Sequence, residues 1–179
     1  MRFNVVLYNP EIPQNTGNIM RTCVAANFML HLIEPLGFSL DLKDVKRCAV
    51  NYTKNLSYEV YPNWEAFKEK NKGSYFFMTR YGKKSPTSIS FKDVENDIYL
   101  IFGKESTGIP YDLLYEHLDN CFRLPMTDKV RALNLSNTVA ICVYEVMRQL
   151  DYPNLITHEP DTMKGADFLN NFHNDIDNK

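Results

Sequence analysis

The alternation of apolar, strand-like runs with helical patterns is the feature that most constrains the fold of this 179-residue chain. Six runs have the length and apolar content of buried strands, and helical patterns separate most of them. Strands that alternate with helices predict an α/β protein with a mostly parallel sheet and helices on both of its faces. The strands are expected at residues 3–9, 29–35, 58–63, 74–80, 97–103 and 121–126.

Helices are expected between these strands, and the clearest is the last. Asn134 or Ser136 can cap its start, and Pro153 follows its end. Its apolar side chains recur every three or four positions, at Leu135, Val139, Val143, Val146 and Leu150. Shorter helical patterns cover residues 18–28, 41–50, 64–71 and 111–118.

Composition favours one soluble globular domain, with 44% hydrophobic and 23% charged residues. We assign this domain to residues 1–157 and expect residues 158–179 to form a polar, acidic, flexible tail or a loosely attached helix. No apolar run approaches the ~20 residues of a membrane span. The N-terminus leads directly into a strand without a signal-peptide pattern, so a cytoplasmic protein is expected.

The cysteines and histidines do not indicate a metal site. The four cysteines contain no C-x-x-C pair, and the four histidines have no ligand spacing. Each cysteine lies in an apolar context, so buried free thiols are favoured over disulfides. We therefore expect no metal.

The charge of the chain is unevenly distributed around a net value of −2, which argues weakly against nucleic acid. Removing residues 158–179 leaves 18 basic against 17 acidic side chains. Within this body, basic residues gather in two bunches that could bind phosphates locally. They are Lys43, Lys46 and Arg47 in the first bunch, and Arg80, Lys83 and Lys84 in the second.

The loop IFGKESTGIP (residues 101–110) superficially resembles a phosphate-binding loop. A Walker loop requires Lys and Ser/Thr after its second glycine, but Ile109 and Pro110 follow Gly108 here. Glu105 inside the loop would also repel phosphate. The dinucleotide fingerprint G-x-G-x-x-G, the Ser/His/Asp set and the motif H-E-x-x-H are absent as well.

Three loops that follow predicted strands instead resemble the three motifs of the SPOUT RNA methyltransferases. They are NTGNIMR, IFGKESTGIP and the pair RLPM and RALNLSNTVAICVYE, and they occur in the family's order. The similarity runs from Asn4 to about Pro153 and is greatest to the tRNA (cytidine/uridine-34) 2′-O-methyltransferases. It implies a homodimeric enzyme that methylates the ribose at the wobble position of tRNA, with tRNA-Leu as the expected acceptor.

The resemblance also implies a C-terminal trefoil knot that grips S-adenosylmethionine. Gly103 and Gly108 suit this role because they permit close backbone approach and positive φ. Ala132 stands where close relatives often have serine, so its contact would be made by the backbone. The full set of expected cofactor residues is Met78, Thr79, Gly103, Glu105, Gly108, Ile109, Leu124, Ala132, Asn134, Ser136 and Asn137.

The catalytic residues implied by the resemblance are Arg21, Asn18 and Tyr144. Because the pKa of arginine lies above ~12, we expect Arg21 to orient the substrate phosphate and not to act as a base. Asn18 lies one helical turn earlier and could direct Arg21. Arg131 and the two basic bunches are expected to bind tRNA across a dimer.

Two alternatives remain open at this stage. The first is a catalytically silent, SPOUT-like protein that only binds RNA. The second is a Rossmann-type enzyme that uses a nucleotide or NAD, against which the missing glycine fingerprint argues.

Overall fold

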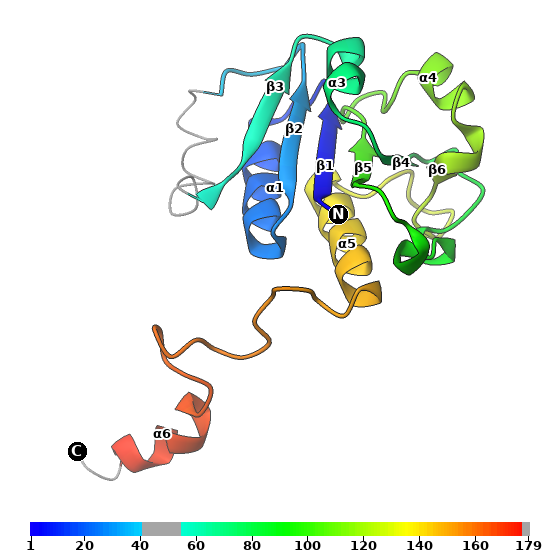
Figure 1. Ribbon diagram of the computed structural model, residues 1–179. Coiled ribbons are helices and arrows are strands. Elements are labelled where there is room, and N and C mark those ends of the chain that lie inside the picture. Colours follow the sequence, from blue (N-terminus) through cyan, green and yellow to red (C-terminus); the bar gives the residue numbers. More distant parts are fainter. Residues whose placement is uncertain (41–54, 177–179) are drawn as a thin grey trace.

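The protein contains one six-stranded sheet in the order β3-β2-β1-β5-β4-β6, and every neighbouring pair of strands is parallel. This computed structural model describes residues 1–40 and 55–176. Chain order reverses beside β1, which pairs with β2 on one side and β5 on the other (Figure 1). The strands are β1 (Phe3–Tyr8), β2 (Met29–Ile33), β3 (Tyr58–Tyr61), β4 (Ser74–Met78), β5 (Ile98–Phe102) and β6 (Cys121–Phe122).

Helices cover both faces of the sheet, as the sequence predicted. Two of them, α1 (Pro13–Ala26) and α5 (Leu135–Gln149), pack against each other on one face (Figure 1). The other face contacts α3 (Trp64–Lys70) and α4 (Tyr111–Tyr115). The chain also forms α6 (Phe168–Ile176) near its C-terminus.

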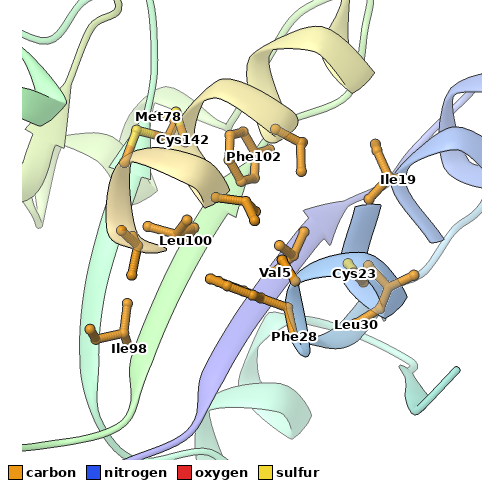
Figure 2. Packing of buried hydrophobic residues seen from close by; sticks show 14 of the residues in the cluster. Val5, Ile19, Cys23, Phe28, Leu30, Met78, Ile98, Leu100, Phe102 and Cys142 are labelled. Carbon is orange, nitrogen blue, oxygen red and sulfur yellow. The ribbon is translucent and has the colours of Figure 1, made fainter. Parts of the chain in front are cut away.

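The core on the α1–α5 face is almost wholly apolar (Figure 2). On this face Val5 of β1 projects toward Cys23 of α1, and Leu100 of β5 lies beside α5. Side chains alternate between the two faces of a strand, so the neighbours of Val5 and Leu100 in sequence face the opposite core. Both central strands are therefore apolar on consecutive positions, which produced the continuous apolar runs in the sequence.

The opposite core contains a buried polar group among aromatic rings. His31 is 1% exposed, and its ring nitrogens lie 3.0 Å from Tyr61 Oη and 3.1 Å from Asn4 Oδ1. Asn4 in turn donates its amide N–H to the carbonyl of Ile98 at 3.0 Å. Burial lowers the pKa of His31 to about 4, so its ring is neutral at physiological pH.

Helix α1 begins at Pro13, five residues before the predicted start at residue 18. The sequence suggested a turn there because Pro13 and Gly17 disfavour a helix interior. Proline is tolerated in the first helical turn, where its missing N–H has no intrahelical partner. The last strand is also shorter than predicted, because β6 ends at Phe122 and not at residue 126.

Three of the four cysteines can be placed, and all three are buried free thiols as predicted: Cys23, Cys121 and Cys142. Burial raises the pKa of each of these thiols. Cys48 and the helix predicted at residues 41–50 lie outside the described residues. Within the described ranges, no helix is long and apolar enough to cross a membrane.

Candidate active site

A cavity of about 410 Å³ lies where β4, β5 and β6 end. Its lining comes from the segments that follow these three strands, and from Ile12 and Asn15 at the start of α1. In open parallel sheets, ligands bind beyond the carboxyl ends of the strands, next to the point where strand order reverses. The cavity occupies this position and brings all three predicted loops together.

In the loop after β5, the backbone at Gly103 and Lys104 lies in close contact with the backbone at Gly108. The N–H of Gly108 donates to the carbonyl of Lys104 at 2.9 Å. A Cβ on Gly103 would lie 2.1 Å from the carbonyl carbon of Gly108 and 2.2 Å from Ile109 N, so no side chain fits there. Gly108 has a φ of +78°, a conformation that favours glycine. Both glycines are thus required by the shape of the loop.

Glu105 of this loop holds the start of α1 by hydrogen bonds, although the two lie about 90 residues apart along the chain. Its carboxylate accepts the N–H groups of Glu11 at 2.8 Å and Ile12 at 3.3 Å, and the side-chain amide of Asn15 at 2.9 Å. The N-cap residue of α1, Ile12, has no capping side chain of its own. The N–H groups of Glu11 and Ile12 lie before the first helical residue, Pro13, so Glu105 fixes the segment that enters α1 and also binds the side chain of Asn15 in its first turn.

The start of α5 joins the same network. Asn134 donates its amide N–H to Asn15 Oδ1 at 2.9 Å. Its side-chain oxygen accepts from the backbone and hydroxyl of Ser136, at 2.9 and 2.7 Å, and from Asn137 N at 3.4 Å. The predicted capping role of Asn134 is confirmed. Through Asn15, the three loops form one hydrogen-bonded unit around the cavity.

Most of the predicted cofactor residues line this cavity. They are Met78, Thr79, Gly103, Glu105, Gly108, Ile109, Leu124, Ala132 and Asn134. Ser136 and Asn137 do not line it and contact Asn134 instead. The structure therefore places these two residues in support of the loop.

The rim of the cavity carries two tyrosines and two arginines. Tyr81 and Tyr111 lie with their hydroxyl oxygens 2.9 Å apart, and Arg80 Nη2 donates to Tyr81 Oη at 2.7 Å. Hydrogen bonds from Tyr111 and Arg80 hold the pKa of Tyr81 below its usual value. The hydrogen bond between the two tyrosines raises the pKa of Tyr111. Arg131 lines the same cavity. Both arginines were expected from the sequence, but the tyrosines were not, although their positions shortly after β4 and directly after Pro110 were an available signal.

The three predicted catalytic residues lie away from the cavity lining. Asn18 and Arg21 occupy exposed positions on α1, and Tyr144 is 45% exposed on α5. Tyr144 lines a second, shallow hollow together with Ala25 of α1 and Tyr152. These residues therefore belong to the outward surface of the α1–α5 pair.

The predicted RNA-binding residues are only partly placed. Lys43, Lys46 and Arg47 lie outside the described residues. Lys83 and Lys84 are exposed and follow the rim residue Arg80 in the chain. The ammonium of Lys84 lies 3.5 Å from the carbonyl oxygen of Asp119.

Residues 2–144 match the SpoU rRNA Methylase family. The chain belongs to this family. A relative from Bacillus subtilis, provisionally named a tRNA (cytidine(34)-2′-O)-methyltransferase, is 49% identical over 153 residues, which cover 85% of this chain and 96% of the relative. The tRNA (cytidine(34)-2′-O)-methyltransferase of Escherichia coli is 39% identical over 158 residues, covering 87% and 99% of the two chains.

Two solved structures of related proteins share the architecture of this member of the SpoU family. One, solved to address the 2-OH methylation of C/U34 on tRNA, has a TM-score of 0.77 at 35% identity and covers 84% of this chain and 97% of its own. The AdoMet-bound rRNA methyltransferase of Sinorhizobium meliloti has a TM-score of 0.74 at 21% identity and covers 83% and 57%. At this lower identity the second likeness concerns the fold alone.

Proposed function

We propose that this protein transfers a methyl group from S-adenosylmethionine to the ribose 2′-hydroxyl of nucleotide 34, a cytidine or uridine, of tRNA. The observation that carries the proposal is the meeting of the three loops at one cavity, in a chain 39% identical to the Escherichia coli enzyme over nearly its full length. tRNA-Leu is the acceptor that the resemblance favours. We place the reaction in the cytoplasm, together with its tRNA substrate.

The chemistry of the cavity suits S-adenosylmethionine. Phe102, Met78 and Leu124 supply apolar surface for an adenosine, and the loop at Gly103 has no side chain to block backbone contacts. Lys104 supplies a cation for the carboxylate of the methionine part. When bound, the cofactor supplies an electrophilic methyl group on a sulfonium. The pairing of Lys84 with Phe122 and Arg123 is compatible with a C-terminal knot, which we include in the proposal.

The protein's own contribution to the reaction is to position the 2′-hydroxyl and to remove its proton. An alcohol is a weak nucleophile, so orientation and proton transfer make up most of the catalytic task. Arg21 would hold the phosphate beside the target ribose with its planar, bidentate fork. Asn18, one turn away on α1, would fix the direction of Arg21.

We infer that two copies of the chain associate through the outward surface of α1 and α5. This surface carries Ile141, 46% exposed, and Tyr144, 45% exposed, beside the hollow at Ala25. Arg21 lies on the same surface and not in the cavity of its own chain. A dimer formed there would let Arg21 of one copy act at the cavity of the other.

The two alternatives make different predictions. A Rossmann-type enzyme would bind NADH and not S-adenosylmethionine, which calorimetric titration with each ligand distinguishes. A silent RNA-binding protein would bind tRNA without methylating it. Mass spectrometry of tRNA nucleosides from a deletion strain tests the proposal in the cell. The 2′-O-methyl group at position 34 should be absent from this strain and should return when the gene is reintroduced.

A further inference from the structure

The rim of the cavity presents two exposed aromatic rings that are held in a fixed arrangement. Tyr81 is 48% exposed and Tyr111 is 65% exposed. Their ring centroids lie 5.5 Å apart at an interplanar angle of 81°. The hydroxyl contact between them and the bond from Arg80 fix both rings at their polar ends. Both rings therefore keep exposed surface in a restrained geometry, although Arg80 lies over one face of the Tyr81 ring.

The backbone beneath Tyr81 is also fixed. The N–H of Thr79 donates to Phe122 O, and the N–H of Arg123 donates to Lys84 O, both at 2.8 Å. The segment between them approaches β6 so closely that a Cβ on Gly82 would lie 2.4 Å from the carbonyl carbon of Phe122. The guanidinium of Arg123 further donates to the carbonyl of Arg80 at 2.8 Å. Little conformational entropy remains to be lost when a ligand meets the rim.

Positive charge accompanies the rings on the same rim. The guanidinium carbon of Arg80 lies 4.7 Å from the centroid of the Tyr81 ring. Arg131, from the segment before α5, lines the cavity as well and is close enough to act electrostatically on both tyrosines. Aromatic rings beside guanidinium groups match the two parts of a single-stranded nucleotide, because bases stack on the rings and arginines bind the phosphates.

We propose that Tyr81 and Tyr111 form a stacking platform for a base of the tRNA segment that carries the target ribose, with Arg80 and Arg131 on its phosphates. This inference rests on the proposed function, and it names the side chains that receive the substrate. Position 34 lies in a single-stranded loop of tRNA, where bases are free to leave their own stack. The interior of the cavity, lined by Gly103 and Phe102, remains for the cofactor, and the exposed rings lie at its entrance.

The test measures RNA binding without turnover. A tRNA anticodon stem-loop is titrated by fluorescence anisotropy into wild-type protein and into Tyr81→Ala, Tyr111→Ala, Tyr111→Phe and Tyr115→Ala. Tyr111→Ala should weaken RNA binding by roughly 5- to 150-fold, the range for losing one stacked base, and Tyr81→Ala should behave alike. Tyr111→Phe retains the ring and should stay close to wild type.

Tyr115 provides the matched control, because it lies one turn after Tyr111 on α4, is 78% exposed and does not line the cavity. Tyr115→Ala should therefore bind RNA as the wild type does. Calorimetric titration with S-adenosylmethionine should give the same affinity for all variants. Unchanged RNA binding in both Tyr81→Ala and Tyr111→Ala would overturn the platform. A loss of S-adenosylmethionine binding alone would also overturn it, because the rings would then bind the adenine of the cofactor.

The same experiment separates the platform from the proposed function. If the wild type binds the stem-loop and the alanine variants do not, the platform holds even when no methyl group reaches nucleotide 34. If the wild type methylates nucleotide 34 and the alanine variants bind and react equally well, the proposed function holds and the platform is wrong.

Discussion

Glu11 and Glu105 each accept hydrogen bonds from the loop that contains the other. The carboxylate of Glu105 accepts the backbone N–H of Glu11 at 2.8 Å, and the carboxylate of Glu11 accepts the N–H and hydroxyl of Ser106, both at 2.9 Å. The Ser106 hydroxyl bond holds the pKa of Glu11 below its usual value. This exchange ties the first loop of the candidate site to the second.

Replacing Glu105 by glutamine should loosen this connection. The Glu105→Gln side chain keeps one acceptor oxygen but turns the other position into a donor. This donor would face either the N–H of Glu11 or the N–H of Ile12 and the side-chain amide of Asn15, which bind different carboxylate oxygens. We expect a loss of about 1 to 3 kcal/mol in the free energy of unfolding, measured by urea denaturation, and weaker S-adenosylmethionine binding. Wild-type values for both quantities would show that the hydrogen bonds of Glu105 are not required.

The two glycines of the loop after β5 should respond differently to alanine. Gly108→Ala should cost about 1 to 2 kcal/mol in unfolding free energy, because its Cβ meets no protein atom within 4 Å and only the positive φ is unfavourable. Gly103→Ala should cost more and should lower cofactor affinity on the order of 10-fold or more, because its Cβ meets backbone at 2.1 Å. Denaturation and calorimetry of both variants measure this. A Gly103→Ala protein that binds S-adenosylmethionine normally would remove this loop from the site.

Arg21 should separate catalysis from cofactor binding. Because it lies on the exposed surface of α1 and not in the cavity lining, Arg21→Ala should leave S-adenosylmethionine affinity unchanged. Methyl transfer to tRNA should fall roughly 100-fold or more, because the target ribose loses its orientation. Arg21→Lys should restore little, since an ammonium cannot reproduce the planar fork. A parallel loss of cofactor affinity would place Arg21 in the cofactor site instead.

His31 should make the protein less stable in acid. Its pKa is lowered from 6.5 to about 4 in the folded state, so the unfolded chain binds a proton first as pH falls. The contribution of the neutral ring to the free energy of unfolding is complete above pH 6.5. It is lost as the pH falls from 6.5 to about 4, and the total loss is about 3 kcal/mol. Urea denaturation at several pH values measures this slope, and His31→Gln should flatten it in that window. An equal slope in both proteins would contradict the assignment.

The sequence predicted the alternation of elements and the parallel sheet, and nine of the eleven cofactor residues expected from the family resemblance line the cavity. The elements could be predicted because buried strands and the α5 pattern are local signals, whereas the cofactor residues came from the resemblance of the three loops to the family motifs. The start of α1 was misplaced because Pro13 and Gly17 suggested a turn, and the contacts with Glu105 that fix this segment come from far away in the chain. The sequence also missed Tyr81 and Tyr111, whose pairing exists only once the ends of β4 and β5 lie together.

The most direct test of the account is to locate the methyl group. Purified protein is incubated with tRNA and S-adenosylmethionine labelled on its methyl group, and nuclease fragments are analysed by mass spectrometry, with Arg21→Ala as the control. We predict one label on the ribose of nucleotide 34, at a cytidine or uridine, and almost none with the variant. A label on a base, a label at another position of the tRNA, or no label on any tRNA would contradict the account.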